Sequence, residues 1–277
     1  MAERKATWAA WLGLLFMVVL TVLMLSPFFI VTINAFKTPS DYASHGPLGL
    51  PAVWSLDSLA TFWERVDFSG KLLNSLIISS TVAVVGVLFA LLNAFALGIG
   101  RVRGRLAFLV LFILGNTLPQ ETLAYPIYYF AKALHVYGHP LAVIVVFIVI
   151  QGAFGTYLLS SVFSAFPREM LEAAQVDGAN KNTLLWRIVA PVSLPTLSVL
   201  FTFFFIWTWN EFFLPLILLP SNAAQTVPIA ISVTQGQHNM DATMASASAL
   251  LGLLPCLIFF VLFQRTLTRG VTAGSIK

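Results

Sequence analysis

The sequence predicts an all-α membrane protein that crosses the bilayer several times. Of its 277 residues only 9% are charged and 58% are hydrophobic, whereas soluble domains carry about 25% charged residues. Long stretches contain no Asp, Glu, Lys or Arg, and a helix needs roughly 20 mostly apolar residues to span a bilayer. Lipid admits only helices or closed barrels, and the strict polar–apolar alternation of a barrel strand is absent. We therefore expect helices.

Six spans are expected within a single transmembrane domain that covers residues 1–277. They lie at about 8–33, 72–98, 106–125, 140–162, 194–219 and 245–264. A longer loop, 34–71, follows the first span, and a polar loop, 220–244, precedes the last. The first apolar stretch is too long for the core of a signal peptide and has no small-residue cleavage site after it, so we expect an uncleaved span.

The basic residues predict the orientation of the chain in the membrane. With the N-terminus in the cytoplasm, 11 of the 15 Lys and Arg residues lie on the cytoplasmic side, and the positive-inside rule favours this arrangement. These 11 are Arg4, Lys5, Arg101, Arg103, Arg105, Arg168, Lys181, Arg187, Arg265, Arg269 and Lys277. The four outside are Lys37, Arg65, Lys71 and Lys132. Topology therefore explains the basic charge, and no nucleic-acid partner is expected.

Neither the cysteine nor the histidines indicate a disulfide or a metal site. Cys256 is the only cysteine, which excludes an internal disulfide and a thiolate cluster. His135 and His139 have a spacing compatible with a metal ion, but no acidic residue or cysteine joins them nearby. We expect no metal.

Two spans carry local features of their own. In the third, Pro119 and Pro126 bracket Gln120 and Glu121 in "TLPQETLAYP", and proline kinks a helix because it removes a backbone donor. The sixth span begins with "ATMASASALLG", whose small side chains allow a neighbouring helix to approach closely.

The most polar segment, about 164–193, predicts a helix–turn–helix at the cytoplasmic face of the membrane. Pro167 suits the start of a helix, and Glu169 and Glu172 then lie in its first turns, where the helix dipole favours negative charge. Gly178 predicts the end of this helix, and Asn180 can cap a second one.

The first of these helices has a face suited to contact with another surface. Helical spacing places Met170, Ala173, Ala174 and Asp177 together, and the two alanines leave that face nearly flat. The helix could rest on lipid, but a lipid-bound helix is usually basic and bulky. This one is acidic and rich in alanine, which favours docking on a protein.

The same segment resembles the "EAA" loop of ABC-importer permeases. It meets every fixed position of the pattern EAAxxDGAxxxxxxxxIxxPxxxP, from Glu172 through Gly178 and Ile188 to Pro191 and Pro195. The resemblance implies that the first short helix is a coupling helix, which sits in a cleft of a cytoplasmic ATPase. The coupling residues it implies are Glu169, Met170, Glu172, Ala173, Ala174, Asp177, Gly178 and Ala179.

Further stretches are similar to the carbohydrate permeases typified by the smaller membrane subunit of the maltose transporter. They are "TLPQETLAYPIYYF", "WTWNEFFLPLIL" and the C-terminal "FQRTLTRGVTAGSIK". The resemblance implies a type I importer permease fold in a prokaryotic inner membrane. It also implies a second permease, two ATPase subunits that bind ATP and Mg²⁺, an extracytoplasmic solute-binding protein, and no cofactor on this chain.

Two polar clusters within the apolar runs are candidates for the solute path. Glu211 lies 16 residues beyond Pro195, roughly 24 Å along a helix, and an ionisable group inside a membrane suggests function. Aromatic faces, amides and carboxylates are the groups that hold sugars. Alternatively, these side chains are structural, or the partner permease holds the solute. The candidates are Gln120, Glu121, Trp207, Trp209, Asn210 and Glu211.

The function expected from these patterns is sugar import by a non-catalytic permease subunit. The chain has no phosphate-binding loop, because Gly70-Lys71 is followed by leucine, so a partner must hydrolyse ATP. Import of a polyol or glycerol phosphate is the alternative, although no Lys or Arg lies in the expected membrane core. An ion-coupled transporter would need paired repeats, and an intramembrane hydrolase would need a nucleophile beside a base; neither pattern is found. The basic residues at 101–105 would face lipid, and Arg265, Arg269 and Lys277 would face lipid or the ATPase.

Overall fold

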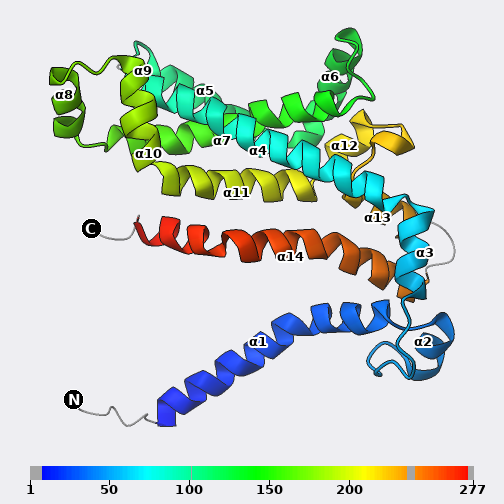
Figure 1. Ribbon diagram of the computed structural model, residues 1–277. Coiled ribbons are helices and arrows are strands. Elements are labelled where there is room, and N and C mark those ends of the chain that lie inside the picture. Colours follow the sequence, from blue (N-terminus) through cyan, green and yellow to red (C-terminus); the bar gives the residue numbers. More distant parts are fainter. Residues whose placement is uncertain (1–7, 101, 236–240, 274–277) are drawn as a thin grey trace. The chain divides into compact units, whose positions relative to one another are not determined.

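The computed structural model describes residues 8–100, 102–235 and 241–273, and these residues form helices and no strand. The expectation of an all-α fold is confirmed (Figure 1). Contacts between residues divide the chain into two units. One unit comprises Met1–Phe68 with Ile231–Leu254, and the other comprises Ser69–Ala230 with Pro255–Lys277.

The first unit begins with α1, Trp8–Ala35, which is apolar on all sides. None of its most apolar window is buried within the chain. An evenly apolar helix is stable only when lipid or protein covers it. Helix α14, Ala242–Ala273, enters this unit through its N-terminal part.

The segment after α1, expected as a loop over 34–71, contains two short helices instead. Thr38 caps α2, Pro39–His45, by accepting a hydrogen bond from the N–H of Asp41, and proline suits the first position of a helix. Helix α3, Asp57–Arg65, contacts α14 through a 2.9 Å hydrogen bond between the hydroxyls of Ser58 and Thr243. These helices are too short to be recognised from the sequence pattern.

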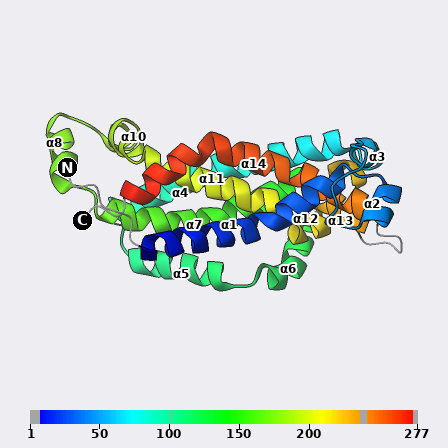
Figure 2. The ribbon, with the colours of Figure 1, turned by 90° about the horizontal axis from the view of Figure 1, so that it is seen from below.

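Three long helices form the body of the second unit: α4, Phe68–Gly98, α7, Pro140–Ser164, and α11, Leu194–Asn210. They run side by side in both ribbon views (Figures 1 and 2). Glycines allow this close approach. A Cβ atom on Gly152 would lie 2.6 Å from the Phe89 ring of α4, and one on Gly155 would lie 2.8 Å from the Phe204 ring of α11.

The expected third span, 106–125, is broken in two and not merely kinked. Helices α5, Arg105–Thr117, and α6, Gln120–Ala133, meet at an angle of 100°. Proline disfavours helical geometry in the residue before it, and Leu118 and Pro119 are both extended, with ψ of 128° and 131°. The chain therefore turns at this point and continues as a second helix.

The expected fifth span, 194–219, is also interrupted. Helix α11 ends at Asn210, and the short helix α12, Phe213–Leu218, begins after two residues. Pro215 cannot donate a backbone hydrogen bond and would clash with the carbonyl of Glu211 in a continuous helix. Within α12 it occupies the first turn, where no donor is needed.

The predicted helix–turn–helix is present. It consists of α8, Arg168–Val176, followed by α9, Lys181–Thr183, η1, Leu184–Val189, and α10, Ala190–Val192. The segment η1 is a π-helix, in which Ala190 N–H bonds to Leu185 C=O. This wider turn comes directly before Pro191, which would disrupt an ordinary helix.

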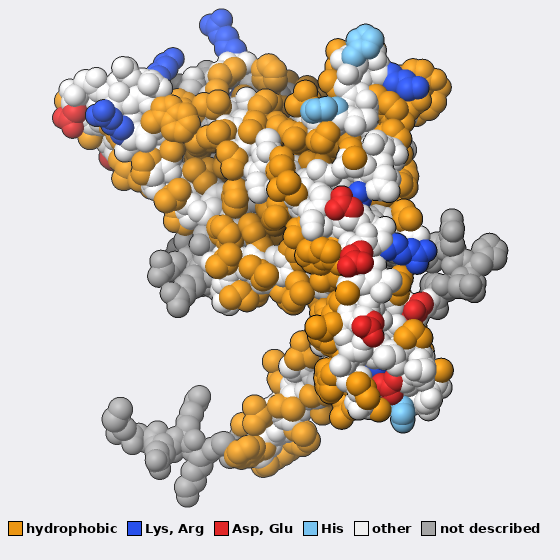
Figure 3. All heavy atoms as spheres, turned by 45° about the vertical axis from the view of Figure 1, so that its right-hand side comes forward, with side chains coloured by type: hydrophobic (Ala, Val, Ile, Leu, Met, Phe, Trp, Pro, Cys, Tyr) orange, Lys and Arg blue, Asp and Glu red, His pale blue; other side chains and the backbone are white. Residues whose placement is uncertain are grey.

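The polar loop expected at 220–244 also contains local structure, the turn η2, Asn222–Ala224, and helix α13, Val227–Gln235. Four helices can each cross a membrane alone, and each of the two bent pairs adds one span, which gives up to six spans. Apolar side chains cover most of the face shown in Figure 3, as contact with lipid requires.

Candidate functional site

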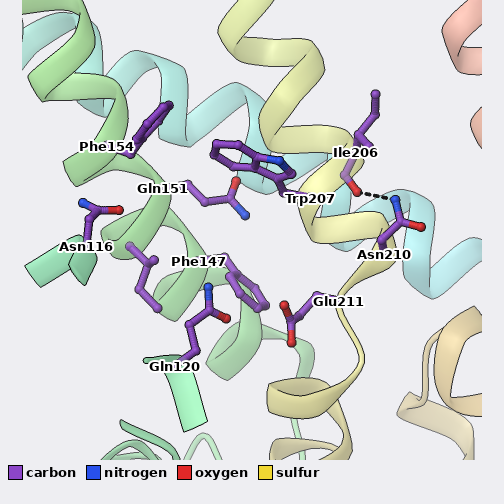
Figure 4. Close-up of a pocket in the computed structure, with 10 residues that line it drawn as sticks. Asn116, Gln120, Phe147, Gln151, Phe154, Ile206, Trp207, Asn210 and Glu211 are labelled. Carbon is purple, nitrogen blue, oxygen red and sulfur yellow. Dashed lines mark hydrogen bonds between the residues drawn. The ribbon is translucent and has the colours of Figure 1, made fainter. Parts of the chain in front are cut away.

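A pocket of 340 Å³ lies within the second unit, beside the two helix breaks. Helices α5, α6, α7 and α11 all contribute to it (Figure 4). The volume falls in the range of about 300–1,000 Å³ typical of small-molecule sites. Its lining comprises Asn116, Gln120, Phe147, Ile150, Gln151, Phe154, Ile206, Trp207, Asn210 and Glu211.

The two breaks place polar side chains in this pocket. Gln120 is the first residue of α6, directly after Pro119, and Glu211 is the first residue beyond α11. Figure 4 shows both side chains extending toward Phe147 from different sides. Glu211 Oε1 accepts hydrogen bonds from the N–H of Phe213 at 3.1 Å and, more weakly, Leu214 at 3.5 Å. The carboxylate thereby caps α12.

Two asparagines line the pocket, Asn116 from α5 and Asn210 from α11. Asn116 Nδ2 donates to the carbonyl of Phe112 at 3.0 Å, and Asn210 Nδ2 donates to the carbonyl of Ile206 at 2.8 Å. A carbonyl can only accept, so the amide nitrogen must face it in both cases. The Asn210 side chain also forms a hydrogen bond with Cys256 of α14, whereas the Oδ1 atom of Asn116 is left for another partner.

Gln151 is the most buried polar side chain in the pocket, with 5% of its surface exposed. Its Nε2 donates to Thr208 Oγ1 on α11 at 2.9 Å. Its Oε1 atom is buried, and no described residue donates a hydrogen bond to it. An unsatisfied buried acceptor costs about 1–3 kcal/mol, so this oxygen favours a ligand that brings a donor.

Trp207 supplies an aromatic surface. It is 43% exposed, and its ring packs edge-on against Phe154 with 5.2 Å between centroids. Phe203 supports it by stacking at 5.7 Å. An exposed indole held among hydrogen-bonding side chains suits a ring with C–H faces and hydroxyl edges, as in a sugar.

The pocket collects four of the six residues that the sequence suggested for the solute path: Gln120, Trp207, Asn210 and Glu211. Glu121 is exposed on α6 and does not line it. Trp209 is 2% exposed and stacks on Phe205 at 5.9 Å, so it belongs to the core. Positions two apart on a helix face nearly opposite directions, which separates Trp209 from Trp207.

Sequence reasoning missed six of the lining residues. Only Gln151 carries a clear signal, as the single amide within the apolar run "FIVIQGAFG". For the other residues, the direction of the side chain depends on the helix breaks. They are Asn116, Phe147, Ile150, Phe154 and Ile206.

The helix–turn–helix has the local structure that its sequence predicts. Helix α8 ends at Val176, and Gly178 adopts a φ of +82°, which glycine accepts without strain. Ala179 N–H returns to the carbonyl of Ala174 at 2.9 Å, which closes the turn. Asn180 Oδ1 then accepts from the N–H of Thr183 at 2.8 Å and caps α9.

Most of α8 is exposed, but the expected flat face is divided. Met170, Ala173 and Asp177 are exposed, whereas Ala174 is buried at 9% exposure and lies on the inner side. Val176, which the sequence did not single out, is 87% exposed at the C-terminal end of the helix. Inward packing of one alanine fixes α8 while leaving the remaining face free.

The basic and histidine residues mostly have local roles. Arg105 Nη2 donates to Ser164 Oγ and so ties the start of α5 to the end of α7. His139 Nδ1 accepts from the N–H of Leu141 at 3.2 Å and caps α7. Arg101, Lys277 and the side chains of Arg265 and Arg269 lie outside the described residues.

Residues 84–273 match the family described as "Binding-protein-dependent transport system inner membrane component". The chain is 31% identical over 264 residues to the diacetylchitobiose uptake system permease protein DasC of Streptomyces coelicolor, with 94% of each chain covered. It is 27% identical over 267 residues to the arabinooligosaccharides transport system permease protein AraQ of Bacillus subtilis, with 95% of this chain and 94% of the relative covered.

The fold also matches a solved structure. A chain from a bacterial ABC transporter involved in the import of the acidic polysaccharide alginate superimposes with a TM-score of 0.81. The sequences are 17% identical, and the match covers 96% of this chain and 98% of the other. At that identity the likeness establishes the fold alone.

Proposed function

The chain belongs to the family of binding-protein-dependent transport system inner membrane components, and on that premise we propose that it is a permease subunit of an ATP-driven saccharide importer. A second permease would complete the membrane path, and two cytoplasmic ATPase subunits would bind ATP and Mg²⁺. An extracytoplasmic solute-binding protein would deliver the cargo. The saccharide uptake named for DasC and AraQ supports the choice of solute.

The exposed face of α8 is the observation that carries the ATPase partnership. Glu169, Glu172, Ala173 and Asp177 are exposed on a helix that the described residues leave largely uncovered. The coupling surface proposed here comprises Glu169, Met170, Glu172, Ala173, Asp177, Gly178 and Ala179, with Ala174 as its inner support.

A continuous run of structure connects α8 to the pocket. The Gly178 turn leads into α9, η1 and α10, whose Leu184, Leu185 and Val189 are buried. Helix α11 follows, about 26 Å long for its 17 residues, and carries Trp207 and Asn210 near its far end. Closure of the ATPase pair would move α8 as a rigid body, and α11 would transmit that movement to the pocket.

We assign Gln120, Trp207, Asn210 and Glu211 to the solute path, because they line one pocket that contains an exposed indole, amides and a carboxylate. Glu121 and Trp209 are not part of this proposal. The pocket would open alternately to the two sides of the membrane as the permease pair changes conformation.

Substitution of Gly178 by valine tests the coupling surface. A β-branched residue is strained at a φ of +82°, and the left-handed conformation costs about 1–2 kcal/mol. Its side chain would also protrude from the docking surface, since nothing lies within 4 Å of an added Cβ. We expect the chain to reach the membrane while ATP-driven uptake and ATPase co-purification fall about tenfold or more, a loss of about 1.4 kcal/mol.

Gly138→Val is the matched control. Gly138 has the same φ of +82° and the same open surroundings, but it lies outside the helix–turn–helix. It should retain ATPase binding. Wild-type uptake and ATPase binding in Gly178→Val would refute the proposed docking.

A further inference from the structure

We propose that the pocket accepts neutral or cationic saccharides and rejects anionic ones, with Glu211 setting the charge preference and Gln151 as a second recognition group. This inference rests on the proposed function, since it requires the pocket to contact the solute. It goes further by naming the charge class of the cargo and a residue that fixes it.

The polar side chains that line the pocket are four amides, which both donate and accept, an indole N–H that donates, and one carboxylate. Asn116 and Asn210 each use one of their two amide N–H groups on a carbonyl of the same helix. Gln151 uses one of its two on Thr208. The carboxylate oxygens of Glu211 are the charged side-chain atoms of the lining, and they can only accept hydrogen bonds. Saccharide hydroxyls and ammonium groups donate to such atoms, whereas a carboxylate or phosphate on the solute only accepts.

Gln151 is held in place before any solute arrives. It lies 11 residues into α7, about 17 Å from the helix start and close to the middle of the span. Gly152 and Gly155 press this stretch against α4 and α11, where a Cβ would meet ring atoms at 2.6 Å and 2.8 Å. Thr208, which is 5% exposed, fixes the amide from the other side. The orphaned Oε1 is thus a positioned acceptor.

Glu211 gives the pocket its charge. It is the only acidic residue among the ten that line the pocket, and none of the ten is Lys or Arg. Its carboxylate accepts only from two backbone groups among the described residues, Phe213 N–H and Leu214 N–H. A second negative charge here would be repelled by this carboxylate and would meet no Lys or Arg in the lining to pair with.

The test compares three monosaccharide probes of similar size: methyl glucoside, glucosamine and glucuronate. Their dissociation constants are measured by isothermal titration on the complete transporter in nanodiscs without the solute-binding protein, so that only the membrane site selects. The wild type should bind glucuronate at least about tenfold more weakly than methyl glucoside, and glucosamine at least as tightly as methyl glucoside.

Two variants separate the roles of the two groups. Glu211→Gln keeps the shape and removes the charge, and it should bring the glucuronate to glucoside ratio close to one. Gln151→Leu should weaken methyl glucoside about tenfold while leaving that ratio unchanged. Thr208→Val should act in the same direction as Gln151→Leu. Thr202→Val is its control, because Thr202 is equally buried on α11 but bonds only to Ser198 of its own helix.

The outcomes distinguish this inference from the function on which it rests. Equal binding of the neutral and anionic probes by the wild type, or an unchanged ratio in Glu211→Gln, would overturn the charge selection. Absence of probe binding alongside intact ATP-driven saccharide uptake would also overturn it and leave the proposed function standing. Absence of ATP-driven saccharide uptake would instead remove the proposed function.

Discussion

Gly155 fixes the distance between α7 and its two neighbours. An added Cβ would lie 2.8 Å from Cζ of Phe204 on α11 and 2.9 Å from Cβ of Ala90 on α4. Real Cβ contacts are never that short, so a larger residue must push the helices apart. The position of Gln151, four residues earlier, depends on this contact.

We therefore expect Gly155→Val to destabilise the second unit. Overpacking of a closely packed core costs about 1–3 kcal/mol, and the melting temperature of the purified protein should fall by several degrees. Gly115→Val is the control, since nothing lies within 4 Å of a Cβ at that position. The melting temperatures are measured by tryptophan fluorescence in detergent. Equal values for both variants would show that Gly155 does not set the distance between the helices.

Lys37 and Lys71 are two of the four basic residues expected on the outer side of the membrane, and both have hydrogen-bond partners within the chain. Lys37 is fully buried and donates to the carbonyl of Gly46 at 2.7 Å. Lys71 is 2% exposed and donates to the carbonyl and the side-chain oxygen of Asn222 at 2.6 and 2.5 Å. These two lysines hold loops together, which is a different role from that of a topology signal.

At the scale of the elements, two proline-directed breaks create the pocket. The break before α6 exposes Gln120, and the break before α12 exposes Glu211. Without them, α5 and α11 would continue as straight spans, and these two polar side chains would have no common space to enter. The broken helices agree with the rule that irregular backbone at membrane depth lines a cavity or is buried in protein.

Replacement of Pro119 by alanine should straighten the first break. It removes the constraint on Leu118 and restores a backbone donor. Spin labels at the exposed Leu111 and Tyr129, in a Cys256→Ser background, should move farther apart than in the parent chain, because a 100° bend brings the two arms together. Uptake should fall several-fold while ATPase binding persists.

Pro140→Ala controls for the loss of a proline alone. Pro140 occupies the first position of α7, where a missing N–H leaves no intrahelical bond unmade. An unchanged label distance in Pro119→Ala would show that packing of α6, and not the proline, maintains the bend.

At the scale of the whole molecule, the proposed function predicts the energy source of transport. We expect uptake in vesicles to depend on ATP and to continue when an ionophore collapses the proton gradient. Loss of at least about nine-tenths of the uptake on collapse of the gradient, with ATP present, would instead indicate ion coupling through Glu211. Vesicles that lack the ATPase subunits serve as the control and should show no uptake.

The sequence predicted most of the helices because their signals are local. Charge-free runs located the long helices α1, α4, α7 and α14 to within a few residues at most ends. The Gly178 turn and the Asn180 cap were confirmed, since each depends on a single backbone conformation or a bond three residues away. Short helices such as α2 and α3 were missed, because their stability comes from contacts with distant residues.

The sequence by itself predicted the family, the fold class, the helix proposed for coupling and four residues of the pocket, because each of these leaves a signal in composition or in local residue spacing. Only the tertiary structure decided that Trp209 is a core residue, that Glu121 does not line the pocket and that Ala174 faces inward. It also brought Gln151 to Thr208, 57 residues away in sequence. The physical reason is that a side chain's surroundings depend on where its helix ends and which helix packs beside it. Here Pro119 and Pro215 determine where helices end, and Gly152 and Gly155 determine how closely neighbouring helices pack.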